Sequence, residues 1–137
     1  MMDVLFVDTN VILDWLADRA PFSEAATQLF ELAEKKEVVL VASSTSFIVS
    51  EYVLRKHLSK AKTLRVLHIL RSVTRIANTG ERQLDMALGS GWNDFEDAFQ
   101  EACARLAGAS TIITRNAKDF SQSTCAVMSP HEYLYSR

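Results

Sequence analysis

Short apolar segments alternate with longer amphipathic stretches along the chain. Two of these segments, 4–7 and 38–41, are unbroken apolar runs, which is the pattern of strands covered on both faces. Segments 111–114 and 126–128 are two further predicted strands. Because helical stretches separate the strands, right-handed crossovers and a mostly parallel sheet are expected. We therefore predict an α/β fold of three layers, α/β/α, with about five strands in the central sheet.

The helices are predicted from apolar residues that recur every third or fourth position and from the residues that begin and end each stretch. The stretch after Asp94 is the clearest, because its apolar stripe continues from Phe95 to Ala107 before Gly108 closes it. Segment 115–124 is predicted to be a loop. Another predicted helix begins near position 11. The remaining ones cover 21–36, 48–57, the basic segment around 64–71, 81–88 and 130–135.

Length and composition indicate one globular domain, residues 1–137, since domains usually hold roughly 100–200 residues. Apolar residues make up 48% of the chain and charged residues 23%, a balance that excludes intrinsic disorder. Two cysteines are too few for a disulfide scaffold, which favours a reducing, cytoplasmic location. Neither a membrane-spanning segment nor a secretory signal is expected, because no apolar run approaches about 18 residues and acidic residues interrupt the amino-terminal segment.

The basic residues are distributed unevenly. The net charge is −2, but segment 52–80 holds seven basic residues and no acidic one. This asymmetry indicates a polyanionic or acidic partner on one face, although a solvated helix surface explains a charge run equally well. The candidate nucleic-acid-binding residues are Arg55, Lys56, Lys60, Lys62 and Arg65.

Oxygen-bearing side chains follow several of the predicted strands. In an open parallel sheet, ligands bind beyond the carboxyl ends of the strands, and the crossover helices have their amino ends at the same edge. The predicted topology brings four segments there: residues 8–10, the helix that carries Glu51, the helix start with Asp94 and Asp97, and residues 114–119. The sequence therefore predicts a cluster of oxygen ligands at this edge.

Taken singly, each of these residues has an ordinary structural explanation. Asp8 and Asp94 suit helix amino ends, and Glu51 suits a solvated helix surface. Together, carboxylates at one edge repel one another by roughly 1 kcal/mol per close pair even in water, so a cation is needed to offset the repulsion. Hard oxygen ligands select Mg²⁺ or Mn²⁺ rather than zinc. Such an ion is suited to activating water against a phosphodiester.

Three segments resemble the sequence motifs of PIN domains. Residues 7–14 (VDTNVILD) are similar to the opening motif, residues 94–104 (DFEDAFQEACA) to the third and residues 112–120 (IITRNAKDF) to the fourth. The resemblance covers nearly the whole chain, and the motifs follow the family's order. It implies a metal-dependent ribonuclease and, among small bacterial single-domain members, a toxin of VapC type from a toxin–antitoxin pair.

The resemblance also implies roles for individual residues. The family's first acid falls on Asp8, with Asn10 as a polar helper. Its third acid falls on Asp97, with Asp94 one turn earlier as an additional ligand. Thr114 matches the hydroxyl that orients the acids. The implied metal ligands are therefore Asp8, Asp94 and Asp97.

Two positions depart from the family's pattern. Asn116 stands where the family has its fourth acid, which removes one negative charge that Asp119 offsets only in part. The second acid is assigned to Glu51, the only acidic residue between positions 43 and 80. A shift of one turn would instead place Val49 or Ser50 at the site.

Two hypotheses follow. The first is a Mg²⁺- or Mn²⁺-dependent endoribonuclease in which Glu51 and Asp94 place or deprotonate the attacking water, while Asn116 and Thr114 complete the site. The second is a catalytically weak PIN-shaped module that binds RNA or a protein, which Asn116 and the poorly defined second motif favour. An antitoxin and a homodimer are further implied by the resemblance. Core packing or contact with such a partner explains four apolar residues, Trp15, Phe22, Leu29 and Phe30.

Overall fold

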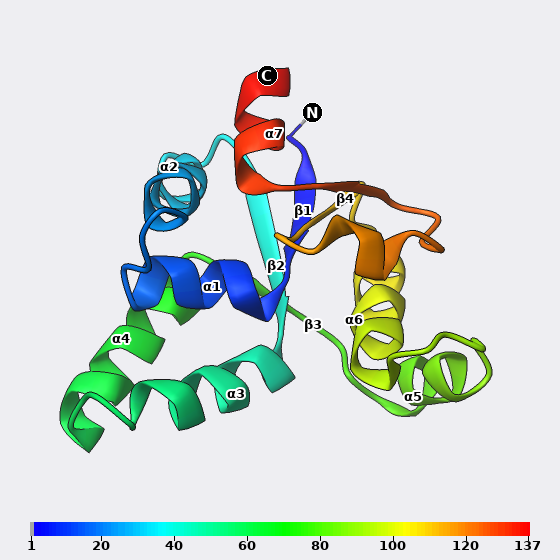
Figure 1. Ribbon diagram of the computed structural model, residues 1–137, viewed down its shortest axis with the longest axis horizontal. Helices are drawn as coiled ribbons and strands as arrows, with labels where there is room; N and C mark the ends of the chain where they lie inside the picture. The colour runs from blue at the N-terminus through cyan, green and yellow to red at the C-terminus, as the bar shows by residue number, and fades with distance from the viewer. Residues whose placement is uncertain (1) are drawn as a thin grey trace.

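A five-stranded sheet forms the centre of the computed structural model, which describes residues 2–137 (Figure 1). Its order is β3-β2-β1-β4-β5, and every neighbouring pair is parallel. The strands are β1 (Val4–Val7), β2 (Val39–Ser43), β3 (Arg75–Ala77), β4 (Thr111–Ile113) and β5 (Ala126–Met128).

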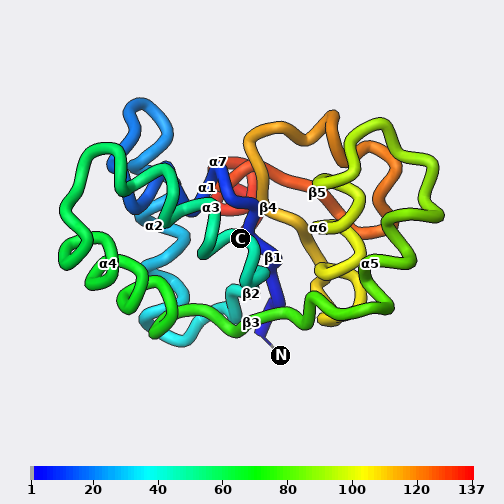
Figure 2. The backbone as a smooth tube through the Cα atoms, turned by 90° about the horizontal axis from the view of Figure 1, so that it is seen from below, coloured from blue at the N-terminus to red at the C-terminus, as the bar shows by residue number. Residues whose placement is uncertain are grey.

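Helices connect the strands and cover both faces of the sheet. They are α1 (Thr9–Leu16), α2 (Ser23–Glu34), α3 (Ser44–Leu54), α4 (Lys60–Ser72), α5 (Glu81–Leu88), α6 (Phe95–Leu106) and α7 (Pro130–Ser136), with a 3₁₀ turn η1 (Ala117–Phe120). In both views α1 to α4 lie on one side of the sheet, and α5 and α6 lie on the other (Figures 1 and 2). The predicted three-layer α/β/α fold is therefore confirmed. No helix among residues 2–137 has the length and apolar character needed to cross a membrane.

Alternation along β1 explains why its sequence is apolar without interruption. Leu5 and Val7 pack in a core cluster with residues of α1, α2 and α7. Phe6 points to the opposite face and packs with Cys103 and Ala104 of α6. Because successive side chains of a strand face opposite sides, a central strand between two helical layers must be apolar at every position.

Two elements were not predicted from the sequence. Strand β3 follows the basic helix directly and is an edge strand with an exposed arginine, Arg75, so it has no continuous apolar pattern. The turn η1 lies inside the predicted loop 115–124, where the buried Phe120 anchors it. Of the predicted helices, 21–36 and 48–57 are observed as Ser23–Glu34 and Ser44–Leu54.

The strand order also locates the functional edge. The chain leads from β1 outward to β2 and β3, and then returns to the other side of β1 with β4 and β5. The strand order therefore reverses between β1 and β4, and we call this place the switch point of the sheet. In such sheets a crevice forms beyond the carboxyl ends of the two strands at the switch point. Asp8 follows β1 directly, and Thr114 follows β4 directly.

Candidate active site

Asp8 lies at the carboxyl end of β1 and is the N-cap of α1. Its backbone amide donates to the Ile113 carbonyl at 2.9 Å, so the residue continues the pairing of β1 with β4. Its Oδ1 accepts from the Thr9 amide at 2.8 Å and its Oδ2 from the Thr114 hydroxyl at 2.8 Å. Burial nevertheless raises the pKa of the Asp8 carboxyl, because these two hydrogen bonds lower it by less.

The hydroxyl of Thr114 connects Asp8 with the neighbouring polar residues. The side chain is fully buried, and its Oγ1 donates to Asp8 while accepting from the Asn116 amide at 3.1 Å. The Asn10 side-chain amide also points to the same oxygen, at 3.4 Å. The structure thus brings together four predicted site residues, Asp8, Asn10, Thr114 and Asn116. In this group Asn10 and Asn116 restrain the hydroxyl that orients the acid.

Two further predicted acids begin α6. Asp94 is the N-cap, and its Oδ1 accepts from the Asp97 amide at 2.9 Å. Asp97 is half-buried, and its pKa is raised to about 7, first by burial and then by the charges of Asp94, Asp8, Asp119 and Glu96. Because the charges of four other carboxylates raise its pKa, Asp97 lies in a region of concentrated negative charge.

We define the acid group as five carboxylates, each of which has a raised pKa or helps to raise the pKa of another: Asp8, Asp94, Glu96, Asp97 and Asp119. Glu96 belongs to it because burial and the charges of Asp8 and Asp94 raise its pKa. Asp119 belongs to it because its charge raises the pKa of both Asp8 and Asp97. Three separate segments of the chain therefore place negative charge at the switch point of the sheet.

Glu51 is the predicted site residue that the structure does not bring into this group. Its Oε2 pairs with Arg55 Nη1 at 3.3 Å, and its side chain is 40% exposed. Neither Asp8 nor Asp97 has Glu51 among the charges that shift its pKa. Ser46 and Ser50 of α3 are instead fully buried, and Leu54 in the last turn of the helix is also buried.

The predicted nucleic-acid-binding residues are all exposed and lie between α3 and the first half of α4: Arg55, Lys56, Lys60, Lys62 and Arg65. Two of them have intramolecular contacts, since Arg55 pairs with Glu51 and Lys56 lies 4.9 Å from the centre of the Tyr52 ring. The helix pair α3–α4 lies on the opposite side of the sheet from α5 and α6 (Figures 1 and 2). The basic segment therefore flanks the acid edge from one side only.

Sequence reasoning missed a buried ion pair that supports the site. Arg115 donates to both carboxylate oxygens of the fully buried Asp14, at 2.6 and 3.2 Å, and its guanidinium lies 4.0 Å from the centre of the Phe22 ring. The pair ties the segment after β4 to α1, and the charge of Arg115 lowers the pKa of Asp8. The sequence did offer a signal for this ion pair, because Asp14 and Arg115 carry opposite charges and each lies in a segment that resembles a PIN motif.

A polar junction beneath Asp8 was also missed. Thr9 Oγ1 and Ser46 Oγ lie 2.7 Å apart, and the Gln100 side-chain amide donates to them at 3.4 and 3.3 Å. This junction joins α1, α3 and α6, and Gln100 lies one turn after Asp97. Ser50 Oγ and Gln100 Oε1 have no hydrogen-bond partner among the described residues. The spacing of Asp97 and Gln100 was the only signal in the sequence.

The donor set of this edge suits a hard divalent cation, because it consists of carboxylate, amide and hydroxyl oxygens. In residues 2–137, no three Asp, Glu, His or Cys side chains are arranged to hold one ion together. The two observations are compatible, since Mg²⁺ keeps several water ligands and often binds through one or two carboxylates. Mutual repulsion also keeps carboxylates apart when no cation lies between them.

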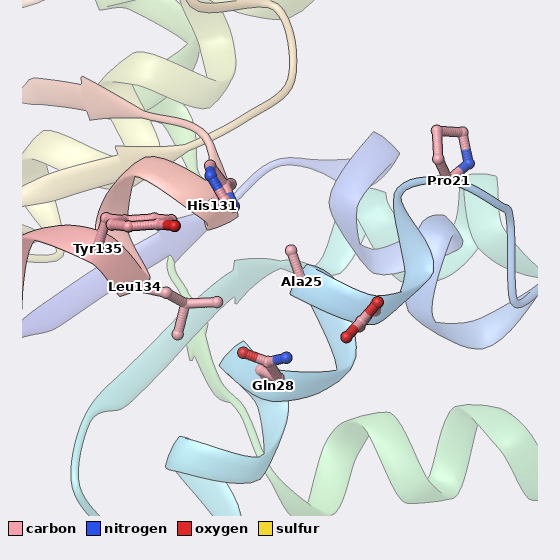
Figure 3. A pocket seen from close by; sticks show the side chains of 7 residues that line it. Pro21, Ala25, Gln28, His131, Leu134 and Tyr135 are labelled. Carbon is pink, nitrogen blue, oxygen red and sulfur yellow. The ribbon is translucent and has the colours of Figure 1, made fainter.

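One of the cavities lies away from the acid group. It has a volume of about 520 Å³ and lies between α2 and α7, where His131, Leu134 and Tyr135 face Ala25 and Gln28 (Figure 3). A smaller cavity of about 300 Å³ is lined by Asp94, Asp97 and Asp119. We regard the smaller one as the functional cavity, because it alone of the two contains members of the acid group.

Comparisons with known proteins agree with this fold. The family model described as PIN domain matches residues 4–118. No curated protein matches the sequence. A toxin–antitoxin complex from Klebsiella pneumoniae contains a similar chain, with 22% identity, a TM-score of 0.69, and coverage of 92% of this chain and 97% of that one.

Two further solved structures are similar. Mycobacterium tuberculosis VapC20, described as a sarcin-ricin loop cleaving toxin, has 18% identity, a TM-score of 0.61, and coverage of 79% of this chain and 86% of that one. VapBC2 from Rickettsia felis, bound to a promoter DNA fragment, has 17% identity, a TM-score of 0.67, and coverage of 92% and 97%. At these identities the likeness concerns the fold. The family match spans most of the chain, including every residue of the acid group except Asp119, and the protein therefore belongs to the PIN domain family.

Proposed function

We propose that this protein is an endoribonuclease that hydrolyses RNA phosphodiester bonds with a divalent metal ion. The acid group at the switch point carries the proposal. The pKa of Asp97, raised to about 7, supports it because burial and then the charges of four neighbouring carboxylates raise that pKa. The PIN domain family match supports the same activity.

In the proposed site, Asp8 and Asp97 hold Mg²⁺ or Mn²⁺, and Asp94 is a further ligand. The ion, when bound, supplies a nucleophilic water at neutral pH and stabilises the leaving oxygen. Thr114 keeps the Asp8 carboxylate oriented through its 2.8 Å hydrogen bond. Asn116 contributes an exposed neutral oxygen in place of a fourth acid. We leave Glu51 out of the metal site, because its carboxylate is paired with Arg55.

RNA binding is assigned to the exposed basic segment of α3 and α4. Lysine and arginine side chains there neutralise phosphates and draw the RNA toward the acid edge. Asp8 and Asp97 would hold the ion, and the ion would offset the repulsion between these carboxylates and the scissile phosphate. This arrangement makes RNA binding at the acid edge depend on the metal.

A cleavage assay tests the proposal. The wild-type protein should cut a structured RNA in the presence of Mg²⁺ or Mn²⁺, and EDTA should stop the reaction. Asp8→Asn should abolish cleavage while the protein remains folded. Asp85→Asn is the matched control, because it removes an exposed acid on α5 that is outside the acid group. Undiminished cleavage by Asp8→Asn would contradict the assignment.

We also propose that the protein is the toxin of a toxin–antitoxin pair, acts in the cytoplasm and forms a homodimer. Support for an antitoxin comes from the similar chain in a toxin–antitoxin complex from Klebsiella pneumoniae. Support for a dimer comes from large apolar side chains that are exposed in one copy on α3, namely Ile48 and Tyr52. Light scattering of the purified protein tests the dimer, and rescue of growth by a neighbouring open reading frame tests the antitoxin.

A second candidate function is a binding module that cuts RNA poorly or not at all. Asn116 favours it, because it stands where the family has an acid. Within residues 2–137, no three Asp, Glu, His or Cys side chains are grouped to hold one ion, which favours it too. A metal-free melting temperature that Mn²⁺ does not change would favour the module. A rise in melting temperature with Mn²⁺ concentration would favour the enzyme, since a ligand that binds only the folded state stabilises it.

A further inference from the structure

A polar cavity of about 300 Å³ extends from the acid group toward the loop between α5 and α6. Three members of the acid group line it, Asp94, Asp97 and Asp119, and the lining also includes Trp92, Asn93, Lys118 and Gln122. We propose that this cavity is a subsite for one nucleotide of a single-stranded RNA, adjacent to the phosphodiester at the acid group. This inference rests on the proposed function and adds to it where the neighbouring nucleotide binds.

Trp92 provides the stacking wall of the subsite. Its ring packs edge-on against the fully buried Phe120, with 6.1 Å between the ring centres. Its backbone amide donates to Ser90 Oγ at 3.2 Å, and the Ser90 hydroxyl donates to the Ala87 carbonyl at 2.8 Å. The hydrogen bonds therefore hold the backbone of Trp92, and the contact with Phe120 holds its ring, before any ligand binds. Every nucleobase has a face that stacks on such a ring, so this wall tolerates different bases.

Lys118 supplies the positive charge. It is exposed, it lies in the same turn as Asp119, and no described acidic residue forms an ion pair with it. A cation that remains unpaired beside several carboxylates is free to bind a phosphate of the ligand. The basic segment of α3 and α4 lies on the other side of the sheet, so Lys118 extends the positive surface past the acids.

Asn93 and Gln122 supply hydrogen-bonding groups for the base edge. Both side chains are exposed, and none of the hydrogen bonds found within residues 2–137 uses their amides. A carboxamide both donates and accepts, so it can pair with donors or acceptors of a base. The cavity therefore suits a nucleotide rather than an apolar ligand, because it combines an indole wall, a free ammonium group and two free amides beside the proposed hydrolytic site.

The test uses two ribo-trinucleotides, UUU and AAA, added to the ¹⁵N-labelled protein with Ca²⁺ present. Ca²⁺ takes the same oxygen ligands as Mg²⁺. We expect the Trp92 indole N–H and the side-chain amides of Asn93 and Gln122 to shift. The indole of Trp15, which is stacked on Phe30 in the core, should not shift. Lys118→Ala and Gln122→Ala should each weaken binding roughly threefold to tenfold.

Lys35→Ala and Gln28→Ala are the matched controls, since both alter exposed side chains of α2 or its end, outside the cavity. Trp92→Leu should weaken binding roughly fivefold to a hundredfold, and its melting temperature reports whether the packing on Phe120 is kept. Trinucleotide binding without shifts at Trp92, or with unchanged affinity for Lys118→Ala and Gln122→Ala, would overturn the subsite. Lack of any RNA binding or cleavage by the wild type would instead contradict the proposed function.

Discussion

Asp97 is a half-buried carboxyl group among other carboxyl groups, and ionising it is costly in the metal-free protein. Burial is the largest cause of its raised pKa, and the charges of Asp94 and Asp8 follow. In the unfolded chain the same group ionises near its ordinary pKa of 3.8. Between these two values the folded state binds the proton more tightly than the unfolded state does, so stability falls as pH rises.

Asp97→Asn should therefore stabilise the metal-free protein at pH 8 and leave its stability nearly unchanged below pH of about 4. The destabilising contribution of Asp97 develops as pH rises from the unfolded pKa of 3.8 and is complete above about 7. Melting temperatures measured in EDTA across this pH range check the prediction. Equal melting temperatures for the two proteins at pH 8 would contradict it.

Thr114→Val removes the hydroxyl that donates to Asp8 and accepts from the Asn116 amide. We expect a loss of about 1–3 kcal/mol in the free energy of unfolding, because a buried carboxylate loses a partner. We also expect weaker Mn²⁺ binding, because Asp8 is no longer oriented. Urea denaturation and calorimetric titration measure the two effects.

Thr63→Val is the control for this substitution. Thr63 is equally buried, and its hydroxyl donates to the Ser59 carbonyl at 2.9 Å in α4. The Thr63→Val variant should be less stable than the wild type but should bind Mn²⁺ with the same affinity. If both variants bind Mn²⁺ as the wild type does, Thr114 has only a structural role.

At the level of helices and strands, the sequence predicted those elements that have a strong periodic or apolar pattern. Strands β1 and β2 are apolar because helices cover both faces, and α6 carries a regular apolar stripe. Strand β3 begins with the exposed Arg75, so its three residues form no unbroken apolar run, whereas the equally short β5 (Ala126–Met128) does. The turn η1 depends on the burial of a single residue, Phe120, which only the tertiary structure reveals.

The site was predictable where it depends on connectivity alone. Asp8 follows β1 and Asp94 begins α6, so the topology by itself brings them to one edge. Glu51 was less predictable, because its direction depends on the rotation of α3 about its axis, and each residue turns the helix by about 100°. The observed rotation turns Ser46 and Ser50 inward and leaves Glu51 beside Arg55.

Asp94 connects the charge of the site with the stability of α6. Its side chain caps the helix by accepting from the Asp97 amide. Asp94→Ala should be less stable than Asp94→Ser by about 0.5–2 kcal/mol, because serine keeps the cap and alanine does not. Both variants should lower the pKa of Asp97, since the charge of Asp94 is the second cause of its shift.

Urea denaturation of the two Asp94 variants measures the cap, and carboxyl NMR titration measures the pKa of Asp97. Equal stability of the two variants would contradict the capping role. An unchanged Asp97 pKa in both variants would contradict the electrostatic coupling.

At the scale of the whole molecule, positive charge lies on both sides of the acid edge. The basic segment of α3 and α4 is on one side, and Lys118 is on the side of α6 and η1. A single RNA strand that crosses the edge would contact both. The molecule thus combines a negative net charge of −2 with local surfaces that suit a polyanion.

Salt dependence tests the basic side. Lys60→Ala or Lys62→Ala should reduce the slope of log affinity for single-stranded RNA against log salt concentration by about 0.7 each. Lys35→Ala, at the end of α2, should leave the slope unchanged. Slopes are measured by fluorescence anisotropy from low to physiological salt. Equal slopes for all three variants would remove α4 from the RNA-binding surface.

Calorimetric titration of Mn²⁺ into the metal-free protein at pH 8 tests the metal site most directly. We predict that the wild type binds the ion and that Asp8→Asn and Asp97→Asn each weaken binding by at least roughly tenfold. Asp85→Asn, which changes an acid outside the acid group, should bind as the wild type does. Equal Mn²⁺ affinity in all four proteins, or none in the wild type, would contradict a metal site at the switch point of the sheet.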